Sequence, residues 1–139
     1  MADDASRQLR TTGRPGLDLP EIALRDIRIQ IVLDFMHHNL EKRPTLSELG
    51  QLLDLSESRF RSIFVKETGV SPQAYLQTLR LERAKELLTE NGFSVEQIAM
   101  KVGWQDRSHF ERRFKKLYGV TPVQYRKEQS QVLMNRLNY

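Results

Sequence analysis

Residues 106–122 read DRSHFERRFKKLYGVTP, and residues 56–72, fifty positions earlier, read SESRFRSIFVKETGVSP. Each stretch begins with a side chain that can cap a helix, continues with two phenylalanines four positions apart, and ends with a glycine, a hydroxyl residue and a proline. The core, cap and stop positions coincide, whereas most surface positions differ. This pattern indicates one helical structural unit that is used twice.

A short apolar segment precedes each copy, here with a spacing of 49 residues. Thr45 and Ser94 each open a capping-box pattern, which predicts two short helices. Asp54 and Gly103 then occupy the turn, where a left-handed backbone is tolerated by aspartate and favoured by glycine. A short helix, a tight turn and a second helix crossing the first form a helix-turn-helix unit. The sequence therefore predicts two such units in tandem.

The rest of the chain is organised around these units, and no segment alternates with a period of two, so the predicted fold class is all-α. Apolar residues recur at helical spacing from Glu21 onward, and this helix should end before Pro44. Its predicted inward residues are Leu24, Ile27, Ile31, Val32, Phe35, Met36 and Leu40. In the second unit, Phe110, Phe114 and Leu117 are expected to face inward, with Trp104 in the core. The predicted boundaries are a flexible N-terminal arm at 1–21, a first helix-turn-helix subdomain at 22–71, a long linker helix at 72–90, a second subdomain at 91–128 and a C-terminal tail at 129–139.

The composition excludes several functional classes. There is no cysteine, so disulfides, thiolate zinc sites, iron–sulfur clusters and cysteine nucleophiles are ruled out. Apolar runs are no longer than three residues, too short for a membrane span or a signal peptide. The adjacent pair His37 and His38 is expected to be solvated rather than to bind a metal, since neighbours on a helix do not share a face. We expect no catalytic site, no metal, no cofactor and no membrane partner, and a cytoplasmic, nucleoid-associated protein.

Basic residues concentrate in one segment of the chain. Residues 107–127 hold seven basic residues and one acid, a net charge of +6, against +4 for the whole chain. With the phenylalanine pairs turned inward, the second helix of the first unit presents Ser58, Ser62 and Val65, flanked by Arg61. The same face of the second unit presents Ser108, Arg112 and Lys115, with Glu111 and Arg107 beside them. Arginine, serine and glutamate are residue types that read base edges in the major groove of DNA, where the second helix of this motif binds.

Over about residues 25–127 the chain resembles the AraC/XylS family of bacterial transcription regulators. The resemblance rests on LSESRF at 55–60, FVKETGVSP at 64–72, RLERA at 80–84, Ile98-Ala99 with Val102-Gly103-Trp104, SHF at 108–110, and FKKLYGVTP at 114–122. It implies seven helices, with two helix-turn-helix units joined by a long helix, and contacts to adjacent major-groove segments. It also implies transcription activation through contact with RNA polymerase. Only residues 1–21 precede the resemblance, so the chain resembles the short single-domain members or an excised domain.

The family pattern, carried over by position, gives six candidate base-reading residues: Ser58, Arg61, Ser62, Arg107, Ser108 and Arg112. Candidate phosphate contacts are Arg59, Lys66, His109, Arg113, Lys115 and Lys116.

Two functional hypotheses follow. The first is a sequence-specific regulator of transcription, expected to be an activator, that binds double-stranded DNA as a monomer. The alternative is a helical protein-interaction adaptor that has lost sequence-specific DNA reading, which the two small serines on the first reading helix would favour. Retention of Arg61, Arg107 and Arg112 speaks against the adaptor.

Overall fold

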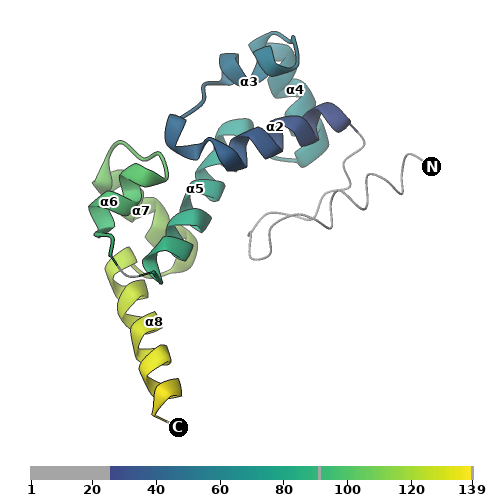
Figure 1. The fold of residues 1–139 in the computed structure, drawn as a ribbon. Coiled ribbons are helices and arrows are strands. Elements are labelled where there is room, and N and C mark those ends of the chain that lie inside the picture. Colours follow the sequence, from purple (N-terminus) through teal and green to yellow (C-terminus); the bar gives the residue numbers. More distant parts are fainter. Residues whose placement is uncertain (1–25, 91, 139) are drawn as a thin grey trace, which may run out of the picture. The chain divides into compact units, whose positions relative to one another are not determined.

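The computed structural model describes residues 26–90 and 92–138. Within them the chain forms seven α-helices, a short 3-10 helix and no strand, which confirms the all-α prediction (Figure 1). In chain order these are α2 (Ile27–His38), the 3-10 helix η1 (Leu40–Lys42), α3 (Leu46–Leu52), α4 (Glu57–Thr68), α5 (Pro72–Leu88), α6 (Val95–Lys101), α7 (Arg107–Tyr118) and α8 (Pro122–Leu137). The arm at 1–21 lies outside the described residues. None of the described helices is long and apolar enough to cross a bilayer.

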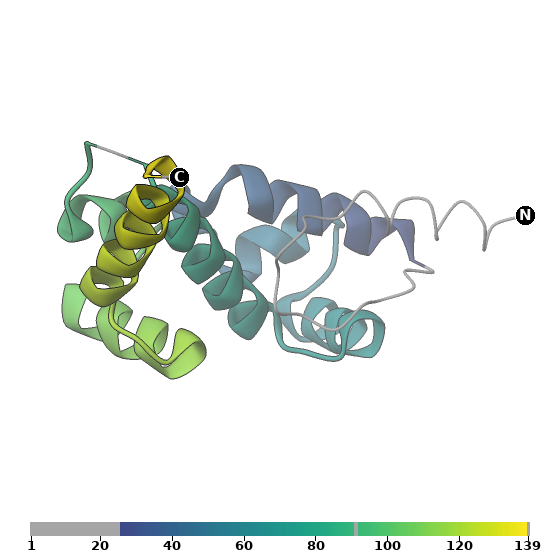
Figure 2. The ribbon, with the colours of Figure 1, turned by 90° about the horizontal axis from the view of Figure 1, so that it is seen from below.

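The chain divides into two compact units, Met1–Leu79 and Arg80–Tyr139. The division falls within α5, which runs as one continuous helix in both views of the ribbon (Figure 1, Figure 2). Residues of α5 up to Leu79 belong to the hydrophobic core of the first unit, and residues from Leu81 onward belong to that of the second.

In the first unit, the core is built around Phe60 and Phe64 of α4, both fully buried as predicted. The buried face of α2 differs from the prediction. Ile27 is 60% exposed and Ile31 is 52% exposed, so their assignment to the core was wrong. The helix begins only after Asp26, whose side chain accepts a hydrogen bond from the backbone of Arg28. The buried residues of α2 are Ile29, Val32, Leu33 and Met36, at spacings of three and four, so the prediction was correct for Val32 and Met36. Leu24 lies outside the described residues.

In the second unit, Phe110 and Phe114 of α7 are fully buried, and Trp104 belongs to the same core, as predicted. Leu117, expected inward, is 38% exposed, and that prediction was wrong. The neighbouring Tyr118 turns inward instead and its hydroxyl donates a hydrogen bond of 2.8 Å to Glu82 of α5. This hydrogen bond and the packing of the ring against Phe114 hold Tyr118, rather than Leu117, against the core.

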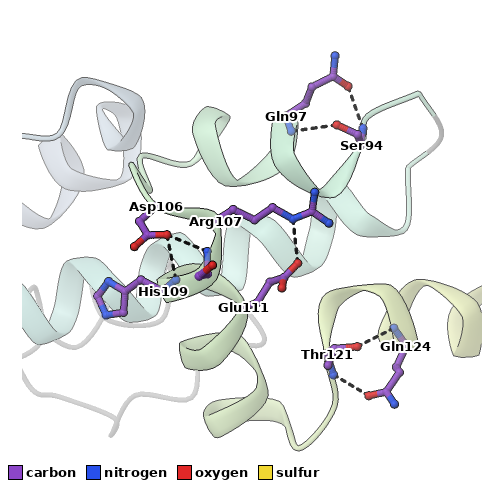
Figure 3. Close-up of polar contacts among 9 residues, drawn as sticks. Ser94, Gln97, Asp106, Arg107, His109, Glu111, Thr121 and Gln124 are labelled. Atoms are coloured by element: carbon purple, nitrogen blue, oxygen red, sulfur yellow. Dashed lines mark hydrogen bonds and ion pairs between the residues drawn. The ribbon is translucent and has the colours of Figure 1, made fainter.

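The predicted caps and stops fix where the helices begin and end. Ser56 caps α4 and Asp106 caps α7, and Gly69 and Gly119 end those helices in left-handed conformation at φ 82° and 81°. Ser94 and Thr121 each form a reciprocal capping box, with Gln97 and Gln124 respectively (Figure 3). At α3 the Thr45 hydroxyl accepts the expected bond from the backbone of Glu48, but the reciprocal bond from the Glu48 side chain is not formed, so the predicted capping box is only half present. Helix α8 extends to Leu137, so its second half occupies most of residues 129–139.

Candidate nucleic-acid interface

The two predicted helix-turn-helix units share one turn geometry. In the first, the backbone N–H of Leu55 donates to the Gly50 carbonyl at 2.9 Å, and in the second that of Trp104 donates to the Ala99 carbonyl at 2.9 Å. The residue before each donor is left-handed, with φ 57° at Asp54 and φ 97° at Gly103. Both turns were predicted at these positions, and both deliver the chain into the capped first turn of the second helix.

Close packing at the turn of the first unit explains why Gly50 stands in the short helix α3. A Cβ atom placed on Gly50 would lie 2.9 Å from the carbonyl oxygen of Leu55, which belongs to the backbone and cannot swing away. The absence of a side chain here lets α3 approach the start of α4 closely. This contact sets the position from which α4 projects.

All six candidate base-reading residues have exposed side chains. They are Ser58, Arg61 and Ser62 on α4, and Arg107, Ser108 and Arg112 on α7. On each helix they lie within the first two turns. Ser58, Ser62, Ser108 and Arg112 are on the face opposite the buried phenylalanines, Arg61 flanks that face, and Arg107 is in the first turn of α7. The arrangement leaves the N-terminal half of each second helix accessible to a ligand.

Each of these helices carries one ion pair between residues four apart, with the charges in opposite order. On α4, Glu57 precedes Arg61, and their closest atoms are 3.5 Å apart. On α7, Arg107 precedes Glu111, and Nε of Arg107 donates to the glutamate Oε1 at 2.9 Å (Figure 3). The pairs occupy matching positions in the two units, so the two exposed faces differ in the placement of charge as well as in residue type.

Further along α7, two positive charges on the exposed face are not balanced by acidic side chains of the described residues. Among the described residues, Arg112 and Lys115 have no carboxylate within ion-pair distance. Lys116 follows near the end of the same helix. Exposed guanidinium and ammonium groups in this position suit a polyanionic ligand.

The six candidate phosphate contacts fall into two groups. Exposed side chains belong to Arg59 and Lys66 on α4 and to Lys115 and Lys116 on α7. His109 and Arg113 are half-buried. The ring of His109 packs edge-on against Trp104 with centroids 5.1 Å apart, so part of the imidazole surface is covered by this core residue. The basic segment also contains Arg126, whose Nε donates to the Leu88 carbonyl at 3.2 Å within the second unit.

A polar cluster around one buried carboxylate was not predicted. Glu82, which belongs to the RLERA stretch of the long helix α5, is only 6% exposed. It accepts the Tyr118 hydrogen bond at Oε2, and Nζ of Lys85 lies 3.8 Å from its Oε1 and 4.7 Å from the Tyr118 ring centroid. Burial, and secondarily the Glu82 charge, raise the pKa of the nearby Tyr125 hydroxyl. The Glu82–Tyr118 pair is 36 residues apart in sequence, and no local pattern marks such a contact.

Among the described residues there is no group of three or more His, Cys, Asp or Glu side chains that could hold a metal ion. His38 is exposed, as predicted, and its Nδ1 lies 2.7 Å from the Asp34 carbonyl. His37 is half-buried with its Nδ1 atom buried, so the prediction of a solvated pair was wrong for His37.

Comparison with known proteins bears on these two units. The profile of a family described as a helix-turn-helix domain matches residues 49–128, from α3 into α8. The crystal structure of a Chromobacterium violaceum transcriptional regulator, described as containing an AraC-type DNA-binding domain, superimposes with a TM-score of 0.70 at 24% identity, covering 76% of this chain and 94% of that one. Because the family profile matches more than half of the chain, the chain belongs to the AraC/XylS family.

Two further relatives of this AraC-type domain are more similar in sequence. The C-terminal domain of the two-component response regulator yesN from Fusobacterium nucleatum is 34% identical, with a TM-score of 0.68, over 73% of this chain and 99% of that one. The probable transcriptional regulator LumQ of Photobacterium leiognathi is 31% identical over 100 residues, which is 70% of this chain and 40% of LumQ. The chain thus spans less than half the length of the curated relatives that it matches.

Proposed function

We propose that the chain is a sequence-specific regulator of transcription that binds double-stranded DNA with two non-identical reading helices. Helix α4 would enter one major-groove segment and α7 an adjacent one, and a single molecule would occupy an asymmetric site. The observation that carries this proposal is the exposure of all six candidate base-reading side chains on the N-terminal halves of α4 and α7. The family's regulators of transcription support the same conclusion.

The roles of two neighbouring cations on α7 can be separated. Arg112 lies in the N-terminal half of the helix and can pair bidentately with guanine, a contact that discriminates by roughly 1–3 kcal/mol. Lys115, nearly one turn further, would contact phosphate. Arg112→Ala should relax the preference at particular base pairs, whereas Lys115→Ala should weaken binding to all sequences alike. Selection from random duplexes followed by affinity measurement tests this assignment, and equal, sequence-independent losses for both variants would refute it.

Salt dependence distinguishes DNA reading from the adaptor alternative. About six phosphate contacts would give a slope near −5 in a plot of log affinity against log salt concentration. A slope shallower than about −2 on the selected duplex would favour the adaptor.

The form of the selected site tests the asymmetry. Since the two exposed faces carry different residues, the two halves of the site should differ in sequence. A selection that returned only inverted repeats would contradict occupancy by one monomer.

The regulatory outcome is part of the same proposal. We propose activation through contact with RNA polymerase, as in the family. Transcription in vitro from a promoter carrying the selected site, with and without the protein, measures its direction. A decrease in transcript would identify a repressor.

A further inference from the structure

One exposed side chain on α4 has no part in the proposed function so far. Val65 is 41% exposed, although Phe64 beside it is completely buried. It lies on the same face as Ser58 and Ser62, seven and three residues further along the helix. Together with Arg61, these residues have the spacing i, i+3, i+4, i+7, which is the spacing of the base-contacting residues on the homeodomain recognition helix.

The polar members of this face discriminate weakly between bases. A serine hydroxyl both donates and accepts, so Ser58 and Ser62 can pair with any base edge. The guanidinium of Arg61 lies 3.5 Å from the Glu57 carboxylate, which competes with a base for its donors. An apolar group is not ambiguous in this way, because the C5-methyl of thymine is the apolar group that the four bases present in the major groove.

Comparison with the second unit indicates that packing does not require an apolar residue at position 65. Fifty residues later the equivalent position is Lys115, on a helix of the same length with a side-chain N-cap, a C-cap glycine and a buried phenylalanine pair at matching positions. The matching site thus accepts a charged side chain, so the helix-turn-helix core does not require valine here.

We infer that Val65 is a specificity-determining residue of the first unit, which contacts a thymine methyl group in the major-groove segment occupied by α4. The inference rests on the proposed function, since it requires α4 to enter the groove. The contact removes the valine methyls and the thymine methyl from water together, and it favours thymine over cytosine at that position. The first unit then selects by an apolar contact, whereas the second selects through Arg112.

Replacement of thymine by deoxyuridine tests the contact directly, because it deletes the methyl group and leaves every hydrogen-bonding group of the base in place. In the selected duplex, each thymine is replaced singly and the affinity of the full chain is measured by gel shift. At one or two positions in the half of the site bound by the first unit, wild-type affinity should fall by about fourfold, as expected for one lost methyl contact. Val65→Ala should bind the unmodified duplex with a similar loss and should no longer respond to deoxyuridine at those positions.

Val123→Ala is the matched control, since Val123 is also an exposed valine, 43% exposed on α8. It should keep wild-type affinity and the wild-type response to deoxyuridine. Circular dichroism and thermal melting establish that both variants are folded before binding is compared.

The outcomes separate the inference from the proposed function. Specific binding with no deoxyuridine-sensitive position, or with the same sensitivity in Val65→Ala, would overturn the role of Val65 and leave DNA reading intact. Absence of any selected sequence would overturn both.

Discussion

Replacing Tyr118 by phenylalanine removes one hydroxyl group and the 2.8 Å hydrogen bond that it donates to Oε2 of Glu82. The ring remains, so its packing against Phe114, with centroids 4.7 Å apart, is retained. The buried carboxylate would be left with Nζ of Lys85 at 3.8 Å, beyond hydrogen-bonding distance. A hydrogen bond to a charged group contributes about 1.5–3 kcal/mol, so we expect the free energy of unfolding of the second unit to fall by about 2 kcal/mol.

The sole tryptophan of the chain provides the assay, because Trp104 lies in the core of the second unit. Urea unfolding followed by its fluorescence should show a midpoint lowered by about 1 M, for a slope of about 2 kcal/mol per molar urea. Glu82→Gln should also destabilise. The same substitution at Glu86, an exposed carboxylate paired with Arg83 at 2.7 Å, should cost less than about 1 kcal/mol.

A Tyr118→Phe variant with a midpoint within about 0.2 M of wild type would refute this reasoning. It would mean that the carboxylate is satisfied without the tyrosine hydroxyl. Equal effects of Glu82→Gln and Glu86→Gln would refute it as well, because burial would then make no difference to the two carboxylates.

Three further predictions concern the turn, the pH range and the long helix. Asp54→Gly should stabilise the first unit by roughly 0.5 kcal/mol in urea unfolding, because left-handed strain of about 1–2 kcal/mol exceeds the entropic cost of glycine of about 0.5–1 kcal/mol; a lower stability would contradict this. Because the folded state raises the pKa of Tyr125, its contribution to stability should be fully present below about pH 10 and be lost as pH rises through the raised pKa; Tyr125→Phe should remove that part of the alkaline decline in the urea midpoint, and an unchanged decline would argue against it. Two alanines inserted between Leu79 and Arg80 would rotate the part of α5 after the insertion by about 200° and would lengthen the helix by only about 3 Å. The insertion point lies between the α5 residues of the first core and those of the second, so neither core loses a residue. Gel shifts should then show most sequence-specific affinity lost and non-specific binding kept, whereas wild-type affinity in a folded variant would indicate a flexible tether.

Local chemistry made much of this fold predictable. Caps at Ser56, Ser94 and Asp106 depend on side chains within three residues of the amide that they bond. Helix ends in the left-handed conformation depend on single glycines. Both features can therefore be identified from a short stretch of sequence. The turn at Asp54 was predictable because an internal copy offered Gly103 for comparison. The exposure of the six base-reading candidates followed from the placement of the phenylalanine pairs.

The failures have a common physical origin. Helical periodicity shows that one face is apolar, but several faces of α2 carry isoleucine or leucine, and only packing decided between Ile27 or Ile31 and the buried Ile29. At the end of α7, the choice of Tyr118 over Leu117 depended on a carboxylate 36 residues away. Partners brought together by tertiary structure leave no trace in local spacing.

The change of core along α5, from Leu79 to Leu81, has a consequence for cooperativity. The two hydrophobic clusters share no residue, but both take residues from α5, so opening of one can propagate to the other along this helix. Native-state hydrogen exchange should therefore resolve two protection levels, one for amides of α2–α4 and one for those of α6 and α7, rather than a single global value. Binding of α4 and α7 to one duplex would then couple the two opening equilibria, and the protection of both groups of amides should rise together on DNA.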